Sequence, residues 1–244
     1  MVSGERSTGE VMQEKIQVLE VELDNCSAKE AMKRVVEHMD IERLNVVEMV
    51  SMNTLARFQE AELDAALFED FDLVLPSDRG ILQAAGIHDE RRLKEVDDLL
   101  FIKMIMRYLQ KNHISVFLLS ETEDLRIQFE NYINEEYSNL KIVESTSLEE
   151  RGSSDDMLLN VINGLEVDCI LSTLSSPLEE SLISKNKSLV NARVWFGFGP
   201  LIREINKEKK GLQKFKENIL RKILKKEVEK QKRKSDIVNN DNGK

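Results

Sequence analysis

Val116-Phe117-Leu118-Leu119 is an uninterrupted run of large apolar residues in the middle of this 244-residue chain. A strand with one face in water alternates apolar and polar residues, so a run without alternation predicts a strand buried on both faces of a parallel sheet. Val194-Trp195-Phe196 has the same character. The two segments therefore predict a sheet whose two faces are both covered by helices.

Further apolar runs of strand length lie on either side of this segment and alternate with stretches of helical length. The first helix is predicted from Ala28 to about Asp40, because Ser27 and Glu30 have the spacing of a capping box. The predicted strands cover residues 44–52, 73–75, 114–119, 140–143, 167–171 and 192–196. Repeated strand, helix, strand units imply right-handed crossovers, so we expect an α/β fold: a Rossmann-like, mainly parallel sheet with helices on both faces.

The loops that follow these strands are the expected place for a ligand, because the carboxyl ends of parallel strands line the crevice of such a fold. The loops cover residues 51–53, 76–80, 120–124, 173–180 and 197–200. Candidate site residues are therefore sought there.

The composition, with 41% apolar and 33% charged residues, is typical of a helix-rich globular protein. Two distant cysteines favour the reducing cytosol over a disulfide framework. The three histidines lack metal-ligand spacing, and Asp70-Phe71-Asp72 precedes a predicted strand, so we expect no metal site and no cofactor. No apolar stretch reaches the ~20 residues of a membrane-spanning helix and no signal peptide is recognisable, so any membrane contact should be peripheral.

Charge is distributed unevenly along the chain. Residues 203–234 contain 14 Lys and Arg against 5 Glu, a net charge of +9, whereas residues 1–202 carry −18. A nucleic acid would repel such an acidic body, so we expect no nucleic-acid binding by the protein as a whole. We expect one domain over residues 1–202, a basic appendage over 203–234 and a disordered end over 235–244.

The basic appendage has the pattern of an amphipathic helix. Apolar residues recur at helical spacings, and Lys and Arg occupy the other positions. The apolar stripe consists of Leu212, Phe215, Ile219, Leu220, Ile223, Leu224 and Val228. Such a helix can lie on an anionic membrane surface, or it can pack on its own domain or on a second copy of the chain. Peripheral membrane binding and a homo-oligomer both stay open.

The loops carry a series of short motifs. In order they are Ser51-Met52-Asn53, then Leu73-Val74-Leu75-Pro76-Ser77-Asp78-Arg79-Gly80, Arg92-Leu93-Lys94-Glu95-Val96-Asp97, Val116-Phe117-Leu118-Leu119-Ser120-Glu121, Leu174-Ser175-Ser176-Pro177-Leu178-Glu179-Glu180 and Gly197-Phe198-Gly199. Taken in this order, they resemble the WecG/TagA/CpsF family of bacterial glycosyltransferases. The resemblance runs from about Val18 to the basic appendage.

The resemblance implies an enzyme that transfers an N-acetylhexosamine from a UDP-sugar to a polyprenyl-diphosphate-linked amino sugar, in the synthesis of a bacterial cell-wall or surface polysaccharide. It also implies a cytoplasmic protein that is peripheral on the inner face of the cell membrane.

The same resemblance implies roles for single residues. Asp78 would be the catalytic base. Ser51, Asn53, Arg92 and Asp97 would hold the sugars, Glu179 and Glu180 would approach the nucleotide, and Arg203 with the appendage would meet the lipid diphosphate. Local structure offers other roles: Asn53 can complete a turn, Asp97 can cap a helix, and Pro177 can be the first residue of a helix capped by Ser176.

Several positions depart from the family pattern. Ser77 stands where the family has its proposed base, and a neutral hydroxyl is no general base at pH 7 without an activating neighbour. Residues 120–124 offer three carboxylates where the family has a glycine pair, which opposes the binding of a diphosphate. Glu179 replaces a glutamine and so loses a hydrogen-bond donor. A catalytically inactive binding or scaffolding subunit is therefore the second hypothesis.

Overall fold

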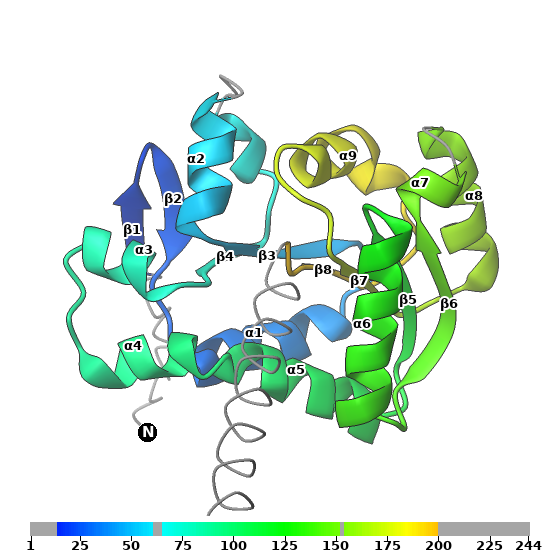
Figure 1. Cartoon of the computed structure of the whole chain (residues 1–244), viewed down its shortest axis with the longest axis horizontal. Coiled ribbons are helices and arrows are strands. Elements are labelled where there is room, and N and C mark those ends of the chain that lie inside the picture. Colours follow the sequence, from blue (N-terminus) through cyan, green and yellow to red (C-terminus); the bar gives the residue numbers. More distant parts are fainter. Residues whose placement is uncertain (1–13, 61–64, 152–153, 200–244) are drawn as a thin grey trace, which may run out of the picture. The chain divides into compact units, whose positions relative to one another are not determined.

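A computed structural model describes residues 14–60, 65–151 and 154–199 of the chain. Its centre is a six-stranded sheet with the order β4-β3-β8-β7-β5-β6, in which every neighbouring pair is parallel (Figure 1). The strands are β3 (Asn45–Val50), β4 (Leu73–Pro76), β5 (Ser115–Ser120), β6 (Lys141–Ser147), β7 (Cys169–Ser172) and β8 (Val194–Gly197). The predicted parallel α/β sheet is confirmed, and all six predicted strands are present.

Helices cover both faces of this sheet. In Figure 1, α1 (Ala28–Met39) and α5 (Leu100–Lys111) lie together on one side of the sheet, and α8 (Asp155–Leu165) and α9 (Leu178–Asn186) lie on the other. The remaining helical elements are α2 (Met52–Glu60), η1 (Ala65–Phe68), α3 (Arg79–Ala84), α4 (Glu90–Asp97), α6 (Glu123–Glu136), α7 (Leu148–Arg151) and η2 (Lys187–Leu189). Within the described ranges, no helix has the length and apolar character needed to cross a membrane.

The start of α1 illustrates how local sequence sets these elements. The Ser27 hydroxyl accepts a hydrogen bond from the Glu30 N–H. In return, the Glu30 carboxylate accepts one from the Ser27 N–H, at 2.8 Å. This is the predicted capping box, which satisfies two N–H groups that the first turn leaves unbonded. The helix ends at Met39, one residue before the predicted limit.

A two-stranded antiparallel hairpin, β1 (Lys15–Val18) and β2 (Val21–Asp24), precedes α1. Its turn places Leu19 and Glu20 at positive φ without a glycine or asparagine. Hairpin turns with positive φ usually carry glycine or asparagine, so this turn has no recognisable signal in the sequence. Asp24 joins the hairpin to the sheet, because its carboxylate accepts from the Val74 N–H at 2.8 Å.

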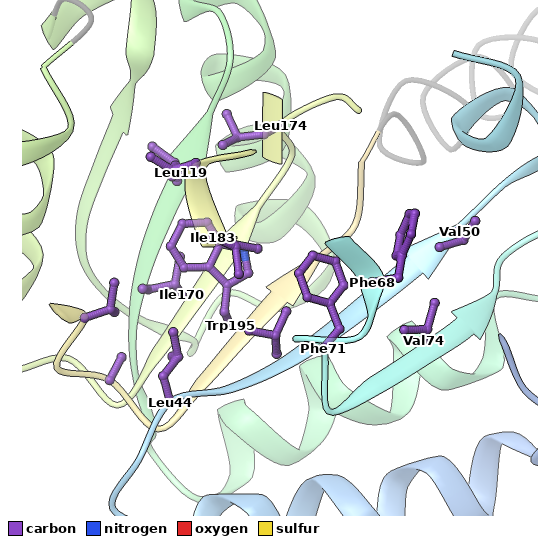
Figure 2. Close-up of a cluster of buried hydrophobic side chains, with 14 of the residues drawn as sticks. Leu44, Val50, Phe68, Phe71, Val74, Leu119, Ile170, Leu174, Ile183 and Trp195 are labelled. Carbon is purple, nitrogen blue, oxygen red and sulfur yellow. The ribbon is translucent and has the colours of Figure 1, made fainter. Parts of the chain in front are cut away.

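The core on the α9 face is built from the central strands and the helices above them. Figure 2 shows Trp195 of β8 and Ile170 of β7 beneath Ile183 of α9, with Phe68 and Phe71 packed further along β3 and β4. The rings of Phe68 and Phe71 pack edge to face, with their centroids 5.5 Å apart. This packing fixes α9 and the loops before it relative to the carboxyl ends of the strands.

The direction of the crossovers reverses at the centre of the sheet. The chain passes from β5 to β6 towards one edge and from β7 to β8 towards the other, yet β5 and β7 are neighbours. Such a reversal is the switch point at which open α/β sheets hold their ligands, outside the carboxyl ends of the strands.

Candidate active site

The loops at the switch point are linked by side-chain hydrogen bonds. The Thr173 hydroxyl after β7 donates to the Ser120 hydroxyl at the end of β5, at 2.9 Å. The Ser175 hydroxyl donates to the Glu121 carboxylate at 2.5 Å. Hydroxyl groups that could otherwise bind a ligand are therefore used to hold the two loops together.

The wall after β5 is rich in carboxylates, as the sequence indicated. Glu123 begins α6 and pairs with Arg126, which also pairs with Glu130 at 2.7 Å. This arrangement lowers the pKa of the Glu123 carboxyl, mainly through the hydrogen bond from Arg126. Arg126 is thus already neutralised by two carboxylates. Glu121 adds a further negative charge beside the place expected for a diphosphate.

Asp78, the proposed base, follows β4 and caps α3. One carboxylate oxygen accepts from the Ile81 N–H at 2.9 Å, and the other accepts from the Met52 N–H at 2.7 Å. The side chain therefore joins the first turns of α3 and α2 and is held in one orientation. Each carboxylate oxygen has a second lone pair, so both can still accept a proton or a hydrogen bond.

Ser77, which the resemblance placed at the position of the family's proposed base, is buried, and its hydroxyl has no partner among the described residues. It lines a cleft together with Arg92 of α4 and mostly apolar neighbours. The cleft offers about 30 Å³ of space, enough for one or two water molecules. A sugar needs a far larger cavity.

Three of the other predicted sugar-binding residues, Ser51, Arg92 and Asp97, have local partners. The Ser51 hydroxyl accepts from the Thr54 N–H at 3.0 Å and so caps α2, where Asn53 is exposed in the first turn. Arg92 pairs with Glu95 at 2.9 Å.

Asp97 pairs with Arg79 of α3, whose Nη2 lies 2.7 Å from its carboxylate. It is the last residue of α4, and α5 begins only at Leu100, so the alternative prediction that Asp97 caps the following helix is wrong.

The structure separates the predicted residues into groups. Ser51, Asn53 and Asp78 meet around the first turn of α2, whereas Asp97 lies on the outside of α4. Pro177 occupies the cap position of α9, one residue before its predicted place as first helical residue. Arg203 and the predicted helix over 203–234 lie outside the described residues.

Glu179 and Glu180 lie in the first turn of α9 and point into the protein, each only 1% exposed. One oxygen of Glu179 accepts from the Trp195 Nε1–H at 2.7 Å. A third buried glutamate, Glu48 of β3, joins them at 2% exposure. Sequence reasoning missed Glu48, although a charged residue inside the apolar run Val46-Val47-Glu48-Met49-Val50 was a signal.

Burial is the main cause of the shifted pKa values of these acids. It raises the pKa of Glu179 to about 8, against the hydrogen bonds from Trp195 and Ser172. It also raises the pKa of Glu48 well above its ordinary value, with a further rise from the negative charges of Glu179 and Glu180. These groups are therefore more often neutral than surface glutamates. Within the described ranges, no cluster of His, Cys, Asp and Glu side chains is arranged to hold a metal ion.

Comparison with known families gives a match over most of the chain. The model of the "Glycosyl transferase WecG/TagA/CpsF family" matches residues 16–211, which include the whole described sheet. No curated protein matches the sequence.

Proposed function

This chain belongs to the WecG/TagA/CpsF family of glycosyl transferases, and we propose that it transfers an N-acetylhexosamine from a UDP-sugar to a polyprenyl-diphosphate-linked amino sugar. The reaction would serve a bacterial cell-wall or surface polysaccharide and would take place on the inner face of the cell membrane. The family match over residues 16–211 carries this proposal. The fold supports it, since the matching loops follow parallel strands, where α/β proteins bind ligands.

Asp78 is the proposed general base. Two backbone N–H groups orient its carboxylate, and the remaining lone pairs can take the proton of the acceptor hydroxyl as that oxygen attacks the anomeric carbon. Asn53 is exposed beside it, on the first turn of α2. We assign Asn53, with Ser51, to the sugar hydroxyls. Arg92, Asp97, Glu179 and Glu180 have partners within the protein and would need to change partners to meet a substrate.

The anionic partners are proposed for the basic appendage. Arg203 and the other cations of residues 203–234 would meet the lipid diphosphate and the acidic headgroups around it.

A catalytically inactive binding or scaffolding subunit is the second candidate. Three observations favour it: the residue aligned with the family's base is a buried serine, the switch-point loops are bonded to each other, and Glu179 is turned inward onto Trp195. Such a subunit would keep the fold and its acceptor or membrane contacts without turnover.

Calorimetry with UDP and with UDP-N-acetylhexosamines separates the two candidates. A transferase should bind the nucleotide sugar saturably and release UDP when a polyprenyl-diphosphate-linked acceptor is added. If no heat of binding is measured at millimolar UDP or UDP-sugar, and circular dichroism shows that the protein is folded, the transferase is rejected and the scaffold is favoured.

A further inference from the structure

Three carboxyl groups are buried together beneath the first turn of α9. Glu48, Glu179 and Glu180 are each at most 2% exposed, and each has one oxygen, Oε2, that is buried without a hydrogen-bond partner among the described residues. An ionised carboxylate in such a place is costly unless it is paired with a cation or fully hydrogen-bonded. The cluster therefore favours carboxyl groups that keep their protons.

Gly197 of β8 shows how closely two of these groups approach. A Cβ at this glycine would lie 1.8 Å from Oε2 of Glu48 and 3.0 Å from Oε1 of Glu179. The Glu48 carboxyl thus fills the space that the glycine leaves open, with the Glu179 carboxyl beside it. One group comes from the sheet and the other from α9, so both carboxyl groups lie where the helix packs on the sheet.

Among the described residues, no positive charge balances the pair. The charged groups that act on Glu48 are Glu179 and Glu180, both acidic, within the part of the chain that the structure describes. The other neighbours are neutral: Ser172 of β7 and Trp195 of β8 form hydrogen bonds to Glu179. Two negative charges would repel each other here with little screening by solvent.

We propose that Glu48 and Glu179 hold at least one proton between them across Gly197 and act as a pH-sensitive lock between α9 and the sheet. Below the transition, one carboxyl group is neutral and the pair holds the first turn of α9 in place. Above it, the last shared proton leaves to solvent, the two carboxylates repel, and the first turn of α9 loosens. Aspartic proteases use the same physics when two adjacent carboxyls share a proton.

The lock would act on the crevice through the loop that leads into α9. Residues 173–177 connect β7 to α9, and Ser175 in this loop bonds to Glu121 on the opposite wall. Movement of the first turn of α9 would therefore alter the loop at the switch point. This inference is independent of the proposed transferase activity, because it concerns the free protein.

Trp195 is the only tryptophan of the chain and bonds directly to Glu179, so its fluorescence reports on the pair. We expect the emission of the full chain to change with pH. The midpoint should lie above the value of about 8 to which burial raises the pKa of Glu179, because the last shared proton is also held by the charge of the neighbouring carboxylate. Glu48→Gln should move the midpoint to lower pH, because the neighbouring charge is gone. The double variant Glu48→Gln with Glu179→Gln should lose the transition.

Glu37→Gln, which changes an exposed glutamate on α1, serves as the matched control and should keep the wild-type transition. Hydrogen exchange, corrected for the intrinsic effect of pH, should show faster exchange of α9 above the midpoint. Infrared spectra of the wild type should show a protonated carboxyl band at pH 6 that is lost above the midpoint, which tests the proposal even if the variants fail to fold. An absent band at pH 6, a transition that survives in a folded double variant, or unchanged exchange of α9 would overturn the lock.

Discussion

At the scale of single residues, Asp78 combines a structural task with the proposed chemical one. Asp78→Asn keeps one oxygen acceptor but places an amide NH₂ against a backbone N–H, so one of the two bonds to Met52 and Ile81 is lost. We expect a loss of about 1–2 kcal/mol in the free energy of unfolding, measured by denaturant titration. If Asp78 is the base, turnover should also fall by about 10²–10⁴.

Asp89→Asn is the matched control for this prediction. Asp89 caps α4 by accepting from the Arg91 N–H at 2.7 Å, and among the described residues it makes no second contact of the kind that Asp78 makes with Met52. Asparagine is as good a cap as aspartate, so this variant should be close to wild type in stability. Unchanged turnover in Asp78→Asn would remove Asp78 from the mechanism.

Glu121 offers a second test at this scale. Glu121→Gln removes a negative charge from the switch point but keeps an oxygen that can accept from Ser175. One charge near a diphosphate is worth on the order of 1 kcal/mol at a partly exposed site, so UDP should bind about fivefold more tightly. Calorimetry at low salt measures this, with Glu37→Gln as a remote control. Equal affinity in both variants would place the nucleotide elsewhere.

At the scale of elements, the signals that predicted the fold were those with a local physical cause. Apolar runs located the six strands, and the Ser27 capping box located α1. Part of β6 was missed because its second half, Glu144 to Ser147, is polar and is held in the sheet by pairing with β5. The hairpin β1–β2 was missed because tertiary contacts, including the bond from Val74 to Asp24, stabilise a turn without typical turn residues.

The contact between β8, β3 and α9 gives a prediction at this scale. Gly197→Ala places a methyl group on the Glu48 carboxyl, which is buried at 2% exposure. We expect a loss of about 1–3 kcal/mol in the free energy of unfolding, as for other overpacked cores. The same substitution in a Glu48→Ala background should cost clearly less, because the carboxyl is absent. Equal costs in the two backgrounds would show that the predicted clash does not occur.

At the scale of the whole molecule, stability should depend on pH in two ranges. Burial raises the pKa of Glu179 to about 8, so the folded protein keeps a proton that the unfolded chain has already released. That stability is present in full below the ordinary pKa of glutamate and is lost as the pH rises through about 8. Asp24 behaves in the opposite way: hydrogen bonds from Arg34 and Val74 outweigh the effect of burial and lower its pKa, so its stabilisation is lost in acid.

We therefore expect a plateau of stability in mildly acidic solution. Above it, the free energy of unfolding should fall by on the order of 2–4 kcal/mol up to about pH 9. Melting curves of the wild type, of Glu179→Gln and of the double variant Glu48→Gln with Glu179→Gln measure this. The single variant should lose the part of the decline that Glu179 causes, and the double variant should lose most of it. A decline of the same size in Glu179→Gln would assign it to other groups.

The candidate site was only partly predictable, because sequence order does not reveal which polar groups face inward. The motif order placed Ser51, Asn53 and Asp78 at the carboxyl ends of β3 and β4, although Asn53 lies in the first turn of α2 and not in the predicted loop. It could not reveal that the Asp78 carboxylate would bond to Met52, since that contact depends on how α2 and α3 begin side by side. Nor could it reveal that Glu179 would turn towards Trp195, which is sixteen residues away in sequence.

The basic appendage gives the last prediction, which rests on charge and periodicity alone. In the membrane model, the apolar stripe inserts at a bilayer surface and the lysines bind acidic headgroups. The full chain should then bind vesicles that contain anionic lipid and should not bind neutral vesicles. Added salt should weaken binding, because attraction between exposed charges is screened over about 8–10 Å at physiological ionic strength.

Replacing Phe215, Leu220 and Leu224 by Ser keeps every charge of residues 203–234 and removes part of the stripe. Insertion requires apolar area, so this variant should sediment with anionic vesicles less well than the wild type. Replacing Lys214, Lys222 and Lys226 by Gln should instead reduce the salt dependence along with the affinity. If the stripe packs on the protein, the serine substitutions should lower the melting temperature and leave vesicle binding unchanged. Equal binding to neutral and anionic vesicles, or none to either, would reject the membrane role.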